Sequence, residues 1–289
     1  TMANPKVVVV ANRKGGVGKT TAVVVLAQVL KERGFKTVAV DLDPQGSLTE
    51  ALAGDMRDRC DSRYLENFLE RGLPGNLDEV GLRQTCALFG RPDVPLALVP
   101  CSDAVWDLEA KMADSVWPVL RSQVDGNWRR LLRRLKREYE CIIIDTAPGR
   151  TTVGGMALKN ADLIIAPCDP TELSVRGLAL FMRELKRKHA SAFNRTRLLW
   201  TRYRNADQID EMRDRHFGAV RVAPPPDLQA SAEGASDEVR GLPDHASFIR
   251  GAVNRDAVTV DSLYRGAASQ AVSRLADAVL RQTNLGEGS

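Results

Sequence analysis

Residues 12–21 read NRKGGVGKTT, a glycine-rich loop with the residue types needed to hold phosphate. The glycines let backbone N–H groups turn toward an anion, and a helix that follows them would direct its positive N-terminus at the same anion. Lys19 can reach the β- and γ-phosphates of a nucleotide, and the hydroxyl of Thr20 can ligate Mg²⁺. The loop therefore predicts a nucleoside triphosphate site. Its expected members are Lys14, Gly15, Gly16, Val17, Gly18, Lys19, Thr20 and Thr21.

The beginning of this loop departs from the common pattern G-x-x-x-x-G-K-[ST]. Counting back from Gly18, the first glycine should stand at position 13, where the chain has Arg13, and Lys14 follows it. Arg13 thus stands in place of the glycine, and a second cation, Lys14, comes next. The question is what Lys14 binds.

Three carboxylates follow apolar runs that read as buried strands. Asp41 and Asp43 come after residues 37–40, and Asp145 comes after Ile142, Ile143 and Ile144. Ligands of doubly wound folds bind at the carboxyl ends of strands. Each aspartate alone could be a helix cap or a turn residue. Together with Lys19 and Thr20 they predict a magnesium-phosphate site, in which carboxylates hold metal-bound water or orient a nucleophilic water.

Strand patterns alternate with helix patterns along the chain. This alternation predicts an α/β fold with a doubly wound, mostly parallel sheet, helices on both faces and one domain over residues 1–289. Residues 54–94 and 224–243 are expected to be variable loops, 283–289 a flexible tail, and Thr1 an addition before Met2. The expected strands are 7–10, 37–40, 96–99, 142–145, 163–166, 197–201 and a weaker 219–222; the expected helices are 20–31, 104–112, 128–137, 173–188 and 267–282.

The composition is that of a globular protein, with 289 residues, 44% hydrophobic and 27% charged, and a net charge of +4. No apolar run approaches the roughly 18 residues that span a bilayer, and the N-terminal residues lack the layout of a secretory signal. We therefore expect a cytoplasmic protein. Its five cysteines are scattered without a C-x-x-C pair, which favours buried, reduced thiols.

Three segments resemble motifs of the ParA/MinD family of partitioning ATPases. They are KGGVGKTT at 14–21, which is similar to the deviant Walker A loop, VDLDPQGSLT at 40–49, and IIIDTAPG at 142–149. Weaker similarity at 96–109 and 161–178 extends the resemblance over roughly the first 200 residues. The resemblance implies a P-loop NTPase of the SIMIBI type that binds ATP and Mg²⁺ and forms an ATP-dependent sandwich homodimer.

The resemblance also assigns roles to single residues. Lys14 matches the signature lysine, which reaches across the dimer to the partner's phosphates much as an arginine finger does. Asp43 matches the residue that positions the attacking water, so that the implied catalytic residues are Lys14, Lys19 and Asp43. The implied metal site consists of Thr20, Asp41 and Asp145. The segment 146–148 reads Thr-Ala-Pro where the family more usually has Cys-Pro-Pro.

Other members with this loop are distinguished by features that this sequence lacks. Nitrogenase iron proteins need Cys-Gly-Gly, iron–sulfur scaffold proteins need C-x-x-C, and the tyrosine kinases end in a tyrosine cluster. A MinD-like ATPase that works at a membrane or a pole, without binding DNA, is the remaining alternative. Its membrane helix should carry a dense Lys/Arg face, whereas residues 270–282 contain Asp277 and no aromatic side chain, which favours a core-packing helix.

Basic runs favour non-specific DNA binding over membrane binding. Between Arg183 and Arg204 eight cations are opposed by one acid, Glu184. A second run, 129–137, is interpreted as the solvated face of a helix.

We predict a ParA-like ATPase that binds the nucleoid as an ATP-bound dimer and is stimulated by a ParB-like or other activating adaptor protein. Its expected DNA contacts are Arg195, Arg197, Arg202 and Arg204, with Arg250 and Arg255 from a segment similar to plasmid-type members.

Overall fold

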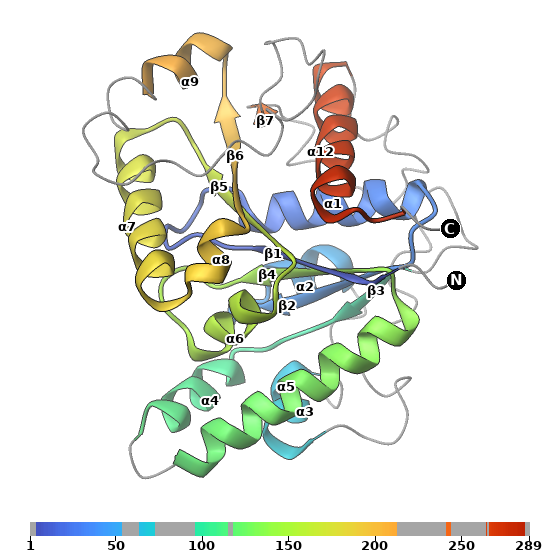
Figure 1. Ribbon diagram of the computed structural model, residues 1–289, viewed down its shortest axis with the longest axis vertical. Helices are drawn as coiled ribbons and strands as arrows, with labels where there is room; N and C mark the ends of the chain where they lie inside the picture. The colour runs from blue at the N-terminus through green and yellow to red at the C-terminus, as the bar shows by residue number, and fades with distance from the viewer. Residues whose placement is uncertain are drawn as a thin grey trace.

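A computed structural model describes residues 4–53, 64–72, 96–114, 118–212, 241–243, 264 and 266–286. Its strands form one sheet in the order β3-β2-β4-β1-β5-β6-β7 (Figure 1). Every neighbouring pair is parallel, as expected from strands that alternate with helices. The strands are β1 (Lys6–Val10), β2 (Thr37–Leu42), β3 (Leu96–Val99), β4 (Cys141–Thr146), β5 (Leu163–Cys168), β6 (Thr196–Tyr203) and β7 (Gly241–Pro243).

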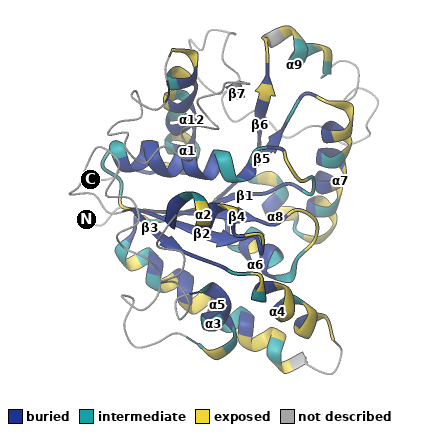
Figure 2. Cartoon of the chain, turned by 180° about the vertical axis from the view of Figure 1, so that it is seen from behind, coloured by how far each residue is buried: buried dark blue, intermediate teal, exposed yellow. Residues whose placement is uncertain are grey.

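The central strands are apolar along their whole length because both faces of the sheet are covered. Val8 and Ile143 belong to the core on one face, and Val9 and Ile144 to the core on the other. Figure 2 shows these strands, and nearly all of α1 (Lys19–Glu32), in the colour of buried residues.

Of the helices in the described ranges, three cover one face of the sheet and the rest lie on the opposite face. The first group is α1, α2 (Ser47–Ala53) and α12 (Ala267–Thr283), whose apolar side chains share a core. The second group shares the other core and consists of α3 (Leu65–Arg71), α4 (Ala104–Ala113), α5 (Pro118–Glu138), α6 (Thr152–Asn160), α7 (Glu172–Lys188), α8 (Ala190–Asn194) and α9 (Ala206–Met212).

The predicted doubly wound α/β fold is confirmed, and most of its expected elements lie within two residues of their predicted bounds. The predicted helix 128–137 is the larger error, because α5 begins ten residues earlier, at Pro118. The first half of α5 was not predicted, because it is a polar stretch that contains Gly126. Also missed were α2, α3, α6, α8, α9 and the edge strand β7, which falls in a predicted loop. The expected strand 219–222 lies outside the described residues.

The last helix packs in the core, as predicted. Val272, Leu275 and Val279 of α12 are fully buried, and Leu280 is partly buried against the same core. Among the residues that the structure describes, no helix combines the length and the apolar character needed to cross a bilayer. Cys101, Cys141 and Cys168 are buried free thiols, in agreement with the prediction for these three; Cys60 and Cys86 lie outside the described residues.

Candidate nucleotide site

The glycine loop connects β1 to α1 and is held from both sides by the neighbouring strands. The side-chain amide of Asn12 donates to the carbonyl of Pro167 in β5 at 2.7 Å, and the hydroxyl of Thr201 in β6 donates to the carbonyl of Val17 at 2.8 Å. Gly16 and Gly18 have φ values of 73° and 88°, in the left-handed region where glycine is favoured. The loop is therefore a fixed cradle at the carboxyl ends of β1, β5 and β6.

Arg13 occupies the position of the missing glycine without backbone strain. Among the described residues other than glycine, Arg202 and Asn284 are those with positive φ, so the backbone at position 13 suits any residue. The carbonyl of Arg13 accepts a hydrogen bond from the N–H of Gly149 at 3.0 Å. This bond links the glycine loop to the segment that follows Asp145.

Lys19 lies over the loop, where it can meet a phosphate. Its Nζ donates to the carbonyl of Lys14 at 3.2 Å, and the residue is only 6% exposed. Burial lowers the pKa of Lys19, while the nearby carboxylates of Asp145 and Asp43 raise it. An anion in the loop would add to the charges that keep the ammonium protonated.

Asp41 and Asp145 face each other in register on β2 and β4, and both are fully buried. Thr20 donates its hydroxyl hydrogen to Oδ2 of Asp145 at 2.6 Å, whereas Oδ1 of Asp145 is buried without a hydrogen-bond partner in the described part of the chain. Burial, with the adjacent Asp41 carboxylate as the next cause, raises the pKa of Asp145 to about 8. An unsatisfied carboxylate oxygen next to a threonine hydroxyl fits a divalent cation.

A magnesium ion at this site would need some of its ligands from water and from the nucleotide. No group of three or more His, Cys, Asp or Glu side chains within the described ranges could enclose a metal alone. Magnesium is usually held by one or two carboxylates, with waters and substrate phosphates as its other ligands. Thr20, Asp41 and Asp145 match that pattern, so the residues predicted for the metal do come together.

Asp43 lies beside this pair and belongs to one hydrogen-bonded network with Asp41. The N–H of Asp43 donates to Oδ1 of Asp41 at 3.0 Å, and Thr49 donates both its N–H and its hydroxyl to Oδ2 at 2.8 Å. The thiol of Cys101 donates to the carbonyl of Asp43 at 2.9 Å. Burial raises the pKa of Asp41 to about 6, against the lowering effect of the bonds from Thr49. Thr49 and Cys101 were not predicted as site residues, although both lie in segments that resemble family motifs.

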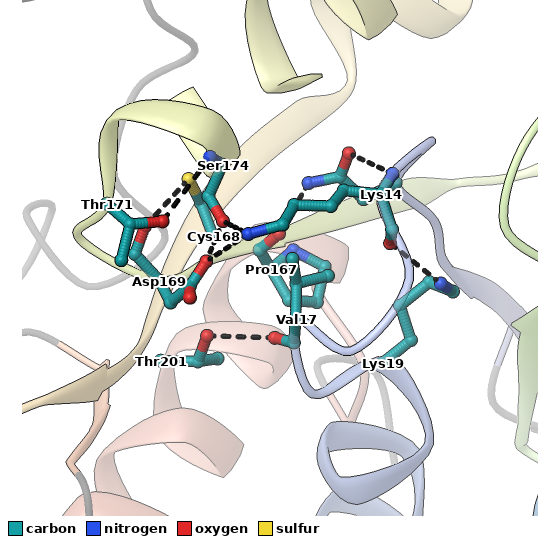
Figure 3. Close-up of polar contacts among 10 residues, drawn as sticks. Lys14, Val17, Lys19, Pro167, Cys168, Asp169, Thr171, Ser174 and Thr201 are labelled. Atoms are coloured by element: carbon teal, nitrogen blue, oxygen red, sulfur yellow. Dashed lines mark hydrogen bonds and ion pairs between the residues drawn. The ribbon is translucent and has the colours of Figure 1, made fainter. Parts of the chain in front are cut away.

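Lys14 is bound within its own chain (Figure 3). Its Nζ lies 3.5 Å from Oδ1 of Asp169 and also donates to the hydroxyl of Ser174, which in turn donates to Asp169. Ser174 lies in the first turn of α7, whose N-cap is Thr171. Asp169 and Ser174 are site residues that sequence reasoning missed, because only the fold brings them to a loop 155 residues away.

Comparison with known proteins places this site in a family. A profile of the AAA domain family matches residues 5–197, which include the glycine loop and all three aspartates. The chain belongs to the ParA/MinD family of partitioning ATPases. The resemblance predicted from its three motifs is thereby confirmed.

Several proteins that are similar to this ParA/MinD family member are named as partitioning proteins. The chromosome-partitioning ATPase Soj of Thermus thermophilus is 28% identical over 73% of this chain and 76% of its own length. The chromosome partitioning protein ParA of Myxococcus xanthus is 29% identical over 60% of this chain, which spans 56% of that relative's length. A plasmid partition protein of Borrelia burgdorferi, solved with AMPPNP, shares the fold with a TM-score of 0.68 and 18% identity, over 96% of this chain and 99% of its own.

The four described cations that were predicted to contact DNA do not form one patch. Arg195 and Arg197 lie at the beginning of β6, while Arg202 and Arg204 lie at its end, near the glycine loop. Arg197 donates to Gln282 and to two main-chain carbonyls, so its guanidinium is largely occupied. Arg202 and Arg204 are exposed. Arg250 and Arg255 lie outside the described residues.

Proposed function

We propose that this member of the ParA/MinD family binds ATP with Mg²⁺ and hydrolyses it slowly at the site described above. The observation that carries the proposal is the Thr20–Asp145 hydrogen bond beside an unsatisfied carboxylate oxygen and the ammonium of Lys19. This arrangement has the donors for a triphosphate and the acceptors for its cation. Solved structures of the same fold contain an ATP analogue, or ADP with magnesium.

Each residue of the site has a distinct task in this proposal. The backbone N–H groups of residues 15–18 and the Nζ of Lys19 would hold the phosphates. The hydroxyl of Thr20 would bind Mg²⁺, and Asp41 and Asp145 would hold it through its waters. The cation supplies charge that stabilises the phosphoryl group during transfer. Asp43 accepts a hydrogen bond from the attacking water and aligns it with the γ-phosphate.

Lys14 makes dimerisation depend on the bound nucleotide in this proposal. To act on a partner, its ammonium must leave Asp169 and Ser174, and the ion pair it gives up is partly exposed and 3.5 Å long. In an ATP-dependent sandwich homodimer it would neutralise the triphosphate held by the partner subunit. Loss of the γ-phosphate would remove that attraction and free the lysine to return to Asp169.

The cellular task that fits these properties is partitioning or positioning of a plasmid, a chromosome or another cargo. The ATP-bound dimer binds DNA non-specifically in the cytoplasm and so associates with the nucleoid, with Arg195, Arg197, Arg202 and Arg204 as candidate contacts. Arg250 and Arg255 are proposed from sequence alone. A ParB-like or other adaptor protein stimulates hydrolysis and releases the dimer. Residues 1–289 form a single ATPase domain in this proposal.

Co-sedimentation with and without ATP tests the proposed function. We expect the wild-type chain to dimerise and to sediment with duplex DNA only when ATP and Mg²⁺ are present, and a Lys19→Ala variant to bind neither nucleotide nor DNA. Vesicles of anionic phospholipid are the parallel sample. ATP-dependent binding to the vesicles but not to DNA would instead support a MinD-like positioning ATPase.

A further inference from the structure

Helix α5 lies on the face of the sheet away from α1 (Figure 1). Two hollows lie next to each other along this helix. The first, with a volume of about 600 Å³, lies between α5, α6, α7 and the segment after Asp145; Arg121 and Lys159 are among its lining residues. The second has a volume of about 470 Å³ and is lined mainly by cations of α5. Lys159 lines one and Asn160 the other, so the two hollows meet at the end of α6. We call the side of these hollows formed by α5 and the end of α6 the α5 channel; its cations are Arg121, Arg129, Arg130, Arg133, Lys136 and Lys159. Arg150 and Lys188 also line the first hollow, outside the α5 channel, and both pair with Glu184.

The amphipathic character of α5 explains why its cations gather on one side. Trp128, Leu131 and Leu135 are buried in the core beneath the helix. The cations alternate with them, so that Arg129 and Arg133 are one turn apart, about 6 Å along the axis. The sequence-based interpretation of a solvated helix face is confirmed for the helix itself, but it did not anticipate that this face borders a hollow.

The charges of the α5 channel are only partly balanced. Arg129 is paired with Asp125, and Nζ of Lys136 lies 3.8 Å from Asp162. Within the part of the chain that the structure covers, Arg121, Arg133 and Lys159 have no ion-pair partner. A row of like charges with this few counter-charges repels itself and attracts an extended anion.

We propose that the α5 channel binds the phosphate backbone of duplex DNA. The proposal rests on the DNA binding proposed above and adds a surface separate from the β6 arginines. Arg121 and Lys136 are 15 residues apart, about 22 Å along the helix, a length that spans roughly six phosphates of one strand at about 3.4 Å each. The channel is thus long enough to release several counterions at once.

The residue types favour nucleic acid over a membrane. Four of the six channel cations are arginines, whose planar guanidinium matches phosphate with two hydrogen bonds. Membrane-surface helices need exposed apolar residues next to their cations, whereas the apolar residues of the basic half of α5 are buried. Val119, which is 75% exposed, lies two residues before Arg121, and residues two apart do not face each other on a helix.

The test compares two double variants of the full chain with ATP and Mg²⁺ present. The channel variant is Arg133→Gln with Lys159→Gln; the control is Arg281→Gln on α12 with Lys111→Gln on α4, which removes the same charge at exposed positions outside the channel. Fluorescence anisotropy measures affinity for a random duplex over a series of salt concentrations. We expect the channel variant to bind about tenfold more weakly or worse. The slope of log affinity against log salt should shrink by about two per protomer. ATP binding, dimerisation and DNA-free hydrolysis should be unchanged.

The possible failures of the two proposals can be told apart. If the wild type binds DNA with ATP and the channel variant keeps the wild-type salt slope, the α5 channel is not a DNA site while the proposed function stands. If the wild type dimerises with ATP but does not bind DNA, the DNA-binding part of the proposed function fails and the channel proposal with it. Binding to anionic vesicles that is lost in the channel variant would reassign this surface to a membrane.

Discussion

The ammonium of Lys14 and the carboxylate of Asp169 lie 3.5 Å apart within a single chain, although Lys14 is the residue proposed to act on a partner. We expect Lys14→Ala to bind ATP like the wild type and to lose ATP-dependent dimerisation and hydrolysis, because the variant lacks the cation proposed to act in trans. Gel filtration with ATP, beside equilibrium nucleotide binding, measures both properties. A Lys14→Ala protein that dimerises normally would contradict the trans role.

Asp169 competes with the partner's nucleotide for the same ammonium. Asp169→Asn keeps an acceptor for Ser174 but removes the negative charge, so Lys14 should be released more easily. Because the two side chains are 25% and 15% exposed, we expect a gain of at most about 1 kcal/mol, or about fivefold tighter ATP-dependent dimerisation. Sedimentation equilibrium checks this. Glu172→Gln, which removes an exposed charge from the same end of α7, is the control, and equal effects of both variants would argue against the competition.

Asp145 makes the nucleotide-free protein sensitive to pH. Its pKa is about 8 in the folded chain and 3.8 ordinarily, so between about pH 4 and pH 8 the native state holds a proton that the unfolded chain has released. Stability therefore falls as pH rises through this window. Asp145→Asn removes the effect. Each pH unit below the folded pKa contributes about 1.4 kcal/mol, so we expect the variant to be nearly equal to the wild type at pH 5 and more stable by up to about 4 kcal/mol at pH 8.5, with a higher Tm.

Thermal unfolding across this pH range, without nucleotide or magnesium, measures the difference between Asp145→Asn and the wild type. Asp107→Asn, at an exposed position on α4, is the matched control and should show no pH-dependent gain. A constant difference between Asp145→Asn and the wild type at all pH values would contradict the proposed titration of Asp145.

Thr49 positions Asp41 through a hydroxyl that donates to Oδ2 and accepts from the N–H of Cys101. Thr49→Val removes both bonds in a side chain of the same shape, while the main-chain bond to Asp41 remains. We expect a loss of about 1–3 kcal/mol in the free energy of unfolding and slower hydrolysis, because Asp41 would be less well held. Urea unfolding and an ATPase assay measure these changes. Thr49→Ser should recover most of both, and its failure to do so would point to packing instead.

The glycine loop, the strands and the three aspartates could be predicted because local patterns encode them. β-Branched runs such as Val7–Val10 specify buried strands, and a strand that ends in aspartate places it at the ligand edge of the sheet. The partners of these residues could not be predicted, because Asp169 meets Lys14 only through the strand order β4-β1-β5. Helix α6 was missed because Gly154 and Gly155 lower its intrinsic helix propensity; Thr151 caps it by accepting from the N–H of Gly154.

The hydrogen bond between the N–H of Gly149 and the carbonyl of Arg13 joins main-chain atoms at both ends. It survives any exchange of the side chain at position 13. A cation can therefore stand at this position while the main-chain connection between the glycine loop and the segment after Asp145 is kept.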